Sequence, residues 1–323
     1  QHLETVFTSC ELGVFDVLEA AERPLTAEEV SRAVGASVDG AERLTSSYPL
    51  PPLPLPAHVS VCYSNTQQAS AFLTRSSPTS LYQAVQFSSG TNYLCWITLC
   101  VDGGLCLNIM LVLPSETTFS QSFLSDEEMG KFMQLMNAIW NICGKDVITA
   151  FDLSPFKNIC DLGGCSGALA KQCTSSYPEC NVIIFDLSKV VQMSRKHFVT
   201  EADQRISFQE GDFFKDSLPE ADLYILSRIL HDWTDQRCIE LLRRIHKACR
   251  SGGAVLVVEA LLNQDGSGPL TAQLYSLNML VQTEGRERTD AQYAALLAAA
   301  GFSSIQHRRT GKIYDAVLGY KQE

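Results

Sequence analysis

NICDLGGCSGAL, residues 158–169, is the most informative segment of this 323-residue chain. An apolar run ends at Asp161, and glycines follow at positions 163, 164 and 167. Glycine permits positive φ angles and lets a ligand approach the main chain, and the first turn of a helix has free amide groups. We therefore predict a strand, a glycine-rich turn and a helix. Alone, this pattern fits a cofactor site and a plain tight turn equally well.

Short apolar runs alternate with helical patterns in the rest of the C-terminal half. We expect strands near residues 158–162, 182–185, 206–210, 223–227 and 254–259, with helices between them. This alternation predicts an α/β fold, a doubly wound, mostly parallel Rossmann-like sheet with helices on both faces. Ahead of it, Ser125 should cap a helix whose apolar stripe includes Met136 and Trp140. Residues 303–309 and 313–321 should close the sheet as an antiparallel hairpin.

Three short helical patterns occupy the N-terminal part. Residues 4–20 carry apolar side chains at helical spacing, Thr26 and Glu29 form a capping box, and Ser37 is placed to cap a third helix. This order predicts a winged-helix-like module, whose usual role is DNA reading. The formal net charge of −11 and the lack of any long Lys/Arg cluster argue against a nucleic-acid partner. A dimerisation or lid role is favoured.

The chain therefore divides into a winged-helix-like dimerisation domain over residues 1–96, a linker over 97–124 and a catalytic domain over 125–323. Residues 45–62 hold five of the twelve prolines, which should keep them extended and solvated. A polyproline ligand for an SH3-like partner is the alternative for that segment. Residues 97–113 are apolar but too short and too interrupted to span a membrane.

Composition points to a well-packed protein, which we expect in the cytoplasm. Hydrophobic residues make up 46% of the chain and charged residues 19%, which allows a sizeable core. The twelve cysteines show neither CxxC pairs nor the Cys/His spacing of a zinc site, so we expect free thiols in a reducing compartment. The polar N-terminal residues do not resemble a signal peptide.

Two acidic residues follow expected strands in register with the glycine-rich turn. Asp186 ends the second strand, where a carboxylate can accept hydrogen bonds from ribose hydroxyls. Asp212 ends the third within Gly211-Asp212-Phe213, where an acid can take an adenine amino group and the aromatic ring can face the base. Either acid alone is more often a cap or turn residue. A dinucleotide dehydrogenase is disfavoured, because its glycines usually follow G-x-G-x-x-G and it needs no third-strand acid.

The fourth strand runs into SRILHDW, residues 227–233. Arg228 and His231 are three residues apart and lie at the carboxyl edge of the sheet, where open α/β folds bind ligands. Histidine accepts protons near neutral pH, and an aromatic hydroxyl has a pKa of about 10, so a nearby base helps to form an attacking oxyanion. Glu259, Glu284 or Glu287 could orient His231, although a glutamate in a charged loop is more often in a solvated ion pair.

Four segments carry a family resemblance: CELGVFDVL, AFDLSPFKNICDLGG, FQEGDFFKDSLPEADLYILSRILHDW and LYSLNMLVQTEGRERT. The chain resembles the small-molecule O-methyltransferases of plants and animals over nearly all of residues 124–323, and over about 1–44 and 63–96. The resemblance implies transfer of a methyl group from S-adenosylmethionine, without a metal, to the 5-hydroxyl of N-acetylserotonin, giving melatonin. It also implies a homodimer built through the N-terminal module.

Site roles follow from the resemblance residue by residue. His231 matches the general base, and Asp232 and Glu287 match its supporting acids. Positions matching the cofactor site are Gly163, Gly164, Asp186, Gly211, Asp212, Phe213, Arg228, Trp140 and Phe123, and positions matching the substrate side are Met136, Asn278 and Gln282. Two departures stand out, because Cys165 replaces a common glycine and Phe123 replaces a frequent tyrosine.

Other functions stay open at this point. Residues 45–62 and 97–122 match nothing in the family, which favours a catalytically impaired relative that binds S-adenosylmethionine or a protein partner. The intact set of Arg228, His231 and Glu287 opposes that interpretation. A methyltransferase for another small phenol is the third possibility.

Overall fold

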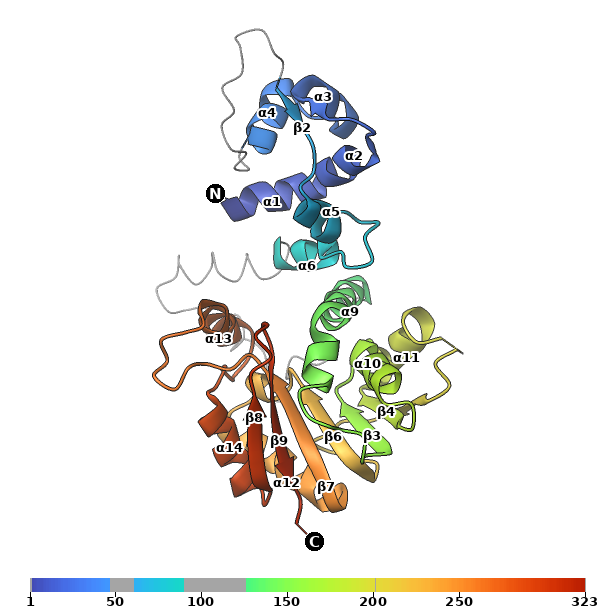
Figure 1. Ribbon diagram of the computed structural model, residues 1–323, viewed down its shortest axis with the longest axis vertical. Helices are drawn as coiled ribbons and strands as arrows, with labels where there is room; N and C mark the ends of the chain where they lie inside the picture. The colour runs from blue at the N-terminus through green and yellow to red at the C-terminus, as the bar shows by residue number, and fades with distance from the viewer. Residues whose placement is uncertain (1, 47–60, 90–125, 201, 323) are drawn as a thin grey trace. The chain divides into compact units, whose positions relative to one another are not determined.

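The computed structural model describes residues 2–46, 61–89, 126–200 and 202–322. The chain divides into two compact units, Gln1–Leu94 and Cys95–Glu323, and each is considered by itself. The larger unit holds the sheet expected around the glycine-rich segment (Figure 1).

Seven strands form this sheet in the order β5-β4-β3-β6-β7-β9-β8. They are β3 (Asn158–Leu162), β4 (Asn181–Asp186), β5 (Ile206–Glu210), β6 (Ala221–Ser227), β7 (Cys249–Glu259), β8 (Ser303–Arg308) and β9 (Asp315–Tyr320). The first five strands of this order pair in parallel, and β9 runs antiparallel to both β7 and β8. The prediction of a mostly parallel α/β sheet closed by an antiparallel hairpin is confirmed.

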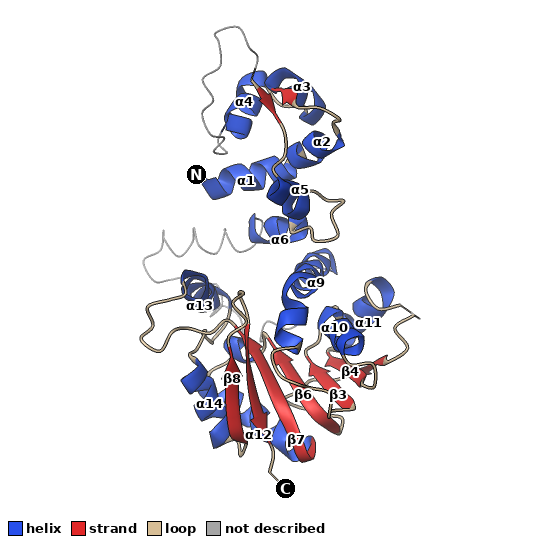
Figure 2. Ribbon diagram, in the orientation of Figure 1, coloured by secondary structure: helices blue, strands red, loops and turns tan. Residues whose placement is uncertain are grey.

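Successive side chains along a strand point to opposite sides of the sheet. In the central strands both sets are buried, one in each of two core clusters. Ile159 of β3 joins one core cluster with Trp140 and Leu169, while its neighbour Cys160 joins the other cluster with Leu241. The helices of this unit are α9 (Asp126–Ile148), α10 (Ala168–Ser176), α11 (Ser188–His197), α12 (Asp235–Ala248), α13 (Leu270–Gln282) and α14 (Asp290–Ala299). Figure 2 shows helices on both faces of the sheet, and α13 beyond one end of the strands. The near-continuous apolar runs of the central strands reflect this double burial.

The N-terminal unit is helical, with one short two-stranded sheet. Its elements are α1 (His2–Glu11), α2 (Val14–Ala20), β1 (Leu25–Thr26), α3 (Ala27–Val34), α4 (Val38–Ser46), β2 (Cys62–Tyr63), α5 (Gln67–Leu73) and α6 (Tyr82–Phe87). The expected caps are present: Thr26 forms its capping box with Glu29, and the Ser37 hydroxyl accepts the amide hydrogen of Gly40. The continuous helical pattern over residues 4–20 is wrong as a single helix, because Gly13 adopts a φ of 75° and divides it.

The unusual segments fall mostly outside the described residues. Residues 47–60 and 90–125 are not described, so the extended proline segment, the linker and the Ser125 cap stay predictions. One correction applies at the edges of the proline segment: α4 continues to Ser46 and β2 begins at Cys62. Within the described ranges, every helix is too short or too polar to cross a membrane, and the nine cysteines found there are free thiols.

Candidate active site

A cavity of about 810 Å³ opens where the carboxyl ends of the parallel strands meet. The loops after β3, β4, β5 and β6 all contribute to its wall, together with one face of α9. Open α/β sheets bind ligands at this edge, because the strand order reverses there and leaves a crevice between the loops. Described lining residues that the sequence singled out are Met136, Trp140, Gly163, Gly164, Asp186, Gly211, Asp212, Phe213, Arg228 and Asp232.

The glycine-rich turn leaves no room for side chains. Gly163 has a φ of 73°, and a Cβ atom there would lie 2.5 Å from Cδ1 of Ile229. A Cβ on Gly164 would lie 2.7 Å from the carboxyl group of Asp161. Cys165, the departure from the glycine pattern, takes a φ of 52°, which costs a residue with a side chain free energy that glycine avoids. Gly163 and Gly164 line the cavity without side chains, so a ligand can approach the main chain at these two residues.

Two carboxyl groups stand behind this turn. Asp186 accepts hydrogen bonds from the amides of Cys165 (2.9 Å) and Leu187 (2.7 Å), and burial raises its pKa to about 6 despite those two donors. Both oxygens of Asp161 are buried and have no hydrogen-bond partner among the described residues. Burial, with the nearby Asp186, raises the pKa of Asp161 to about 7. The wall thus offers acceptors to hydroxyl or ammonium groups of a ligand.

Aromatic rings form the next part of the cavity, after β5. The carboxylate of Asp212 accepts the amide hydrogen of Phe214 (2.9 Å) and pairs with the exposed Lys215 (3.1 Å). The ring of Phe213 meets those of Phe214 and Trp233 edge to face, with centroids 4.9 and 6.5 Å away. An acid beside a rigid aromatic surface suits a flat heterocycle with a hydrogen-bond donor on its edge.

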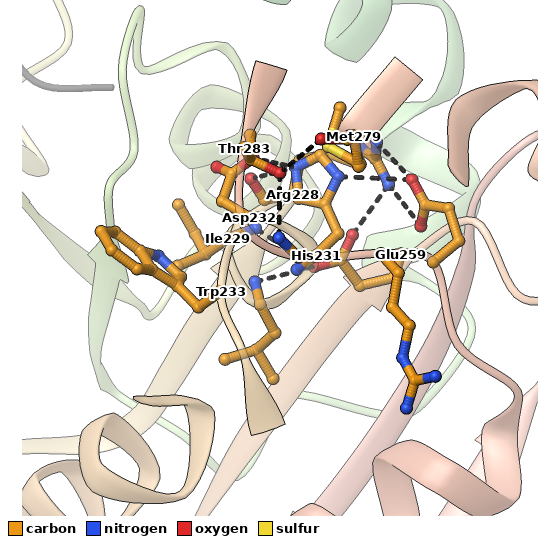
Figure 3. A network of polar contacts seen from close by, with 12 residues as sticks. Arg228, Ile229, His231, Asp232, Trp233, Glu259, Met279 and Thr283 are labelled. Atoms are coloured by element: carbon orange, nitrogen blue, oxygen red, sulfur yellow. Dashed lines mark hydrogen bonds and ion pairs between the residues drawn. The ribbon is translucent and has the colours of Figure 1, made fainter. Parts of the chain in front are cut away.

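Arg228 begins the loop after β6 and binds two glutamates, of which Glu259 is labelled in Figure 3. Its Nη1 donates to Oε2 of Glu259 (2.9 Å) and to Oε2 of Glu287 (3.0 Å), and its Nη2 lies 2.8 Å from Oε1 of Glu287. The backbone of Arg228 has a φ of 57°. This backbone conformation is unfavourable for a residue with a side chain, so surrounding interactions must hold it in place. The charge-assisted hydrogen bonds to the two buried carboxylates do so here.

Glu259, at the end of β7, fixes the loop that carries His231. Its Oε1 accepts hydrogen bonds from the amides of Ile229 (3.1 Å), Leu230 (3.0 Å) and His231 (3.3 Å). These amides begin the single 3-10 turn Leu230–Asp232, whose first donors have no partners within the turn. A carboxylate at that end satisfies them and complements their partial positive charge.

The imidazole of His231 lies between acceptors on both sides. Its Nδ1 is 3.3 Å from Oε1 of Glu287, and its Nε2 is 3.1 Å from the carbonyl oxygen of Arg228 and 3.3 Å from Oδ1 of Asp232. Burial and Arg228 both favour the neutral ring, but the carboxylates of Asp232, Glu259 and Glu287 outweigh them and raise the pKa of His231. The geometry therefore satisfies the protonated ring best, and it stabilises the cation that a base becomes.

The two acids beside His231 differ. Burial raises the pKa of Asp232, and Asp232 lines the cavity. Burial also acts to raise the pKa of Glu287, but Arg228 and His231 overcome it and hold that pKa at about 2. His231 is only 6% exposed and is not among the described residues that line the cavity. The imidazole thus lies behind Asp232 and the Arg228 carbonyl, and not directly on the wall as the sequence suggested.

Ligand atoms of His231, Glu259 and Glu287 lie within 4.8 Å of one another, which resembles a metal-binding cluster. The guanidinium of Arg228 is already bonded to both carboxylates, so this chain supplies its own cation there. A metal ion would have to displace Arg228 and remove the protons from its neighbours.

The α9 side of the cavity is apolar. It consists of Met129, Phe132, Met133, Met136 and Trp140. Among the substrate-side residues expected on α13, Asn278 is half-buried and is not a lining residue of this cavity, and the side chain of Gln282 lies outside the described residues. Phe123 also lies outside the described residues.

Several residues of the site escaped the sequence analysis. Asp161 lies in the quoted glycine segment, where its position before the glycines was an available signal that we did not use. Gly285 and Arg288 lie in the charged segment that follows Gln282, and no local pattern in it distinguishes them from exposed loop residues. Glu284 lies exposed at the cavity rim, whereas Glu287, only three residues later, is buried. The step from the exposed Arg286 to the buried Glu287 and Arg288 was visible only in the structure.

Comparison with known proteins supplies the family. A model of the O-methyltransferase domain matches residues 114–303, and a model of the O-methyltransferase dimerisation domain matches residues 3–75. The chain belongs to the O-methyltransferase family. Similar members include the acetylserotonin O-methyltransferases of Gallus gallus, 52% identical, and Bos taurus, 51% identical. These matches cover 98% of this chain and 93% and 94% of the relatives.

A solved structure agrees with this O-methyltransferase assignment. The crystal structure of human N-acetylserotonin methyltransferase in complex with SAM superimposes with a TM-score of 0.90 at 45% identity. The match covers 99% of this chain and 94% of the human chain. The O-methyltransferase fold and the N-terminal dimerisation domain are thus shared with this relative.

Proposed function

We propose that this O-methyltransferase moves the methyl group of S-adenosylmethionine to the 5-hydroxyl of N-acetylserotonin and so gives melatonin. The observation that carries the proposal is the cavity at the strand ends, where a bare glycine turn backed by acids adjoins the network of Arg228, His231 and Glu287. The names of the chicken, bovine and human relatives point to the same substrate.

The residues at the turn fit the methyl donor. Gly163 and Gly164 let a ligand approach the main chain, and the carboxylate of Asp186 is placed for ribose hydroxyls. The unpartnered carboxyl group of Asp161 fits the ammonium group of a methionine portion. Asp212 and Phe213, after Gly211, suit the adenine ring. When bound, S-adenosylmethionine supplies a methyl group on a positively charged sulfur. Arg228 and Trp140, which line the cavity, would border that part of the donor.

The polar network handles the proton of the substrate hydroxyl. That hydroxyl has a pKa of about 10 in water and is a poor nucleophile while protonated. Asp232 lines the cavity 3.3 Å from Nε2 of His231, so it can take the proton from the hydroxyl and pass it to that nitrogen of the neutral ring. Glu287 holds the other ring nitrogen, Nδ1. The carboxylates that raise the pKa of His231 stabilise the imidazolium formed in this step.

The apolar face of α9 suits the flat ring of an indole. Met136 and Trp140 lie on this face, and the Trp140 ring packs against Tyr314 with centroids 5.1 Å apart. We assign the polar ends of the substrate to Asn278 and Gln282, and a role beside the cofactor to Phe123. Alignment of oxygen, methyl carbon and sulfur in such a slot supplies a large part of methyl-transfer catalysis.

The wider organisation belongs to the same proposal. We assign residues 1–96 to a dimerisation domain, 97–124 to a linker and 125–323 to the methyltransferase domain, and we infer a homodimer. We place the protein in the cytosol. The net charge of −11 disfavours nucleic acid as a partner, and we propose no membrane partner.

A methyl-transfer assay on wild-type protein and His231→Asn tests the proposal. Wild type should convert N-acetylserotonin to melatonin, and the variant should lose about 10²- to 10⁴-fold in kcat while binding S-adenosylmethionine with unchanged affinity. His197→Asn, at an exposed histidine in the last turn of α11, is the matched control and should keep full activity.

Three outcomes would contradict it. A fully active His231→Asn variant would remove the base from the account. Cofactor binding without turnover by the wild type would favour a catalytically impaired relative. Turnover only with other phenols would identify a different substrate.

A further inference from the structure

We propose that Arg288 is a positioning residue that holds the His231 loop against the Glu287 loop, so that the imidazole keeps its place beside the cavity. This inference rests on the proposed role of His231 as the base. It concerns a residue that neither lines the cavity formed by the described residues nor belongs to the polar network described above.

The guanidinium of Arg288 binds the backbone on both sides of His231. Its Nη1 donates to the carbonyl oxygen of Leu230 (2.9 Å), and its Nη2 donates to the carbonyl oxygen of Trp233 (2.7 Å). Its Nε donates to Oδ1 of Asp235 in the first turn of α12 (2.8 Å). Arg288 is only 1% exposed, so its two bonds to the carbonyl oxygens form away from water and depend closely on geometry.

Gly285 brings the two loops into backbone contact. A Cβ atom at position 285 would overlap the carbonyl oxygen of His231 and would lie 2.6 Å from the carbonyl carbon of Asp232 and from the amide nitrogen of Trp233. The loop that carries Glu287 can therefore rest directly on the 3-10 turn only because residue 285 has no side chain. Gly285 and Arg288 make this contact at two separate points.

The loop is also tied to the sheet from behind. The carbonyl oxygen of Arg288 accepts the amide hydrogen of Leu262, just beyond β7 (3.0 Å), and Leu262 bridges to Thr289. Glu287 and Arg288 are consecutive, and they bind different parts of the same turn: Glu287 binds the imidazole and Arg288 binds the carbonyls. A shift of the Arg288 fork would move the Nδ1 of His231 relative to Glu287.

Arg288→Met tests this role, with Arg286→Met as the matched control. Arg286 lies in the same loop and pairs with the same Asp235, at 3.3 Å, but it is exposed. We expect Arg288→Met to lower kcat by roughly tenfold or more, because small misplacements of a catalytic group have effects of this size. Affinity for S-adenosylmethionine should stay unchanged in both variants, and Arg286→Met should keep kcat within about twofold.

Arg288→Lys makes the test independent of whether the methionine variant folds. Lysine keeps the charge beside Asp235 but has no planar fork for two carbonyls. We expect Arg288→Lys to stay folded at the assay temperature with a moderately lowered unfolding midpoint, because buried carbonyls lose donors. We also expect it to lower kcat and to move the acidic limb of the kcat–pH profile. A folded Arg288→Lys variant with wild-type kcat and pH profile would overturn the proposal.

A double-mutant cycle separates this inference from the proposed function. If Arg288 acts through His231, its substitution should cost nothing further in a His231→Asn background, so that the two losses are not additive. Additive losses would overturn the positioning role and leave His231 as the base. Full activity of His231→Asn alone would instead contradict the proposed function.

Discussion

Arg228 sets the charge balance of the site at the scale of single residues. One guanidinium faces two buried glutamates, and the adjoining imidazole can add a second positive charge. Removal of one member of a buried charge pair leaves the other uncompensated, and that costs several kcal/mol. Each substitution in the network therefore changes both the local charge and the position of the loop.

Glu287→Gln should move the pH dependence of activity to lower pH. Glu287 is one of the carboxylates that raise the pKa of His231, so its removal should lower that pKa. Because the base works as the neutral ring, the acidic limb of the kcat–pH profile lies above the ordinary histidine pKa of 6.5 in the wild type and should fall in the variant. The plateau kcat should drop by roughly tenfold or more, because the imidazolium loses its partner.

Kinetics between pH 5.5 and 9 would measure both effects. Glu220→Gln, at an exposed glutamate that pairs with Arg250, serves as the control and should leave the profile unchanged. A limb that stays in place, or moves to higher pH, would show that Glu287 does not set the pKa of His231.

Asp161→Asn should stabilise the ligand-free protein, and more so at high pH. Burial raises the pKa of Asp161 to about 7, against an ordinary value of 3.8. Between these values the native state binds a proton that the unfolded state has lost, so stability falls as pH rises through this window. Asparagine does not ionise, and the gain above pH 7 should be on the order of a few kcal/mol.

Unfolding midpoints at pH 5 and pH 8 would show this gain. The difference between Asp161→Asn and wild type should increase with pH. For the control Asp152→Asn, at an exposed aspartate whose pKa is lowered, the difference should stay constant across this range. A pH-independent difference at Asp161 would mean that this carboxyl group is not protonated in the native state.

The glycine-rich turn and the strands were predictable at the scale of elements, because local signals specify them. Apolar runs marked the strands, and Thr26 marked the start of α3 with its capping box. The break between α1 and α2 was not predictable in the same way. The apolar spacing continues through Gly13, whose φ of 75° separates the two helices.

The assembly of the site could be predicted only in part. That Asp186, Asp212 and Arg228 share one cavity followed from strand alternation, because parallel strands end at one edge. The burial of Glu287 could not be predicted in this way, because its partners Arg228 and His231 lie 59 and 56 residues earlier in the chain. The position of His231 behind Asp232 depends on three amides bonded to Glu259, which no local pattern records.

Gly163→Ala should weaken cofactor binding through the contact between two loops. The new Cβ would lie 2.5 Å from Cδ1 of Ile229, the neighbour of Arg228, so both loops must shift. We expect a loss of roughly tenfold or more in affinity for S-adenosylmethionine, equivalent to about 1.4 kcal/mol.

Gly252→Ala is the matched control for this substitution. Its φ of 72° is nearly that of Gly163, but the space around it is open, so it isolates the cost of the backbone conformation, about 1 kcal/mol of stability. Calorimetric titration of both variants should show weak binding only for Gly163→Ala. Equal affinities would mean that the turn tolerates a side chain at residue 163.

At the scale of the whole molecule, charge and packing agree with a small-molecule enzyme. The chain carries a net charge of −11, and the helices cover both faces of the sheet, so ligand chemistry is concentrated at the loops of one edge. The match to the human structure extends over 99% of the chain, and it includes the N-terminal unit as well as the sheet.

A crystal structure with S-adenosylhomocysteine and N-acetylserotonin soaked in together would test the central claim most directly. We predict the ribose at Asp186, the adenine between Asp212 and Phe213, and the sulfur facing Arg228, with the substrate hydroxyl beside Asp232. A nucleoside bound elsewhere, out of contact with both Asp186 and Asp212, would contradict the account.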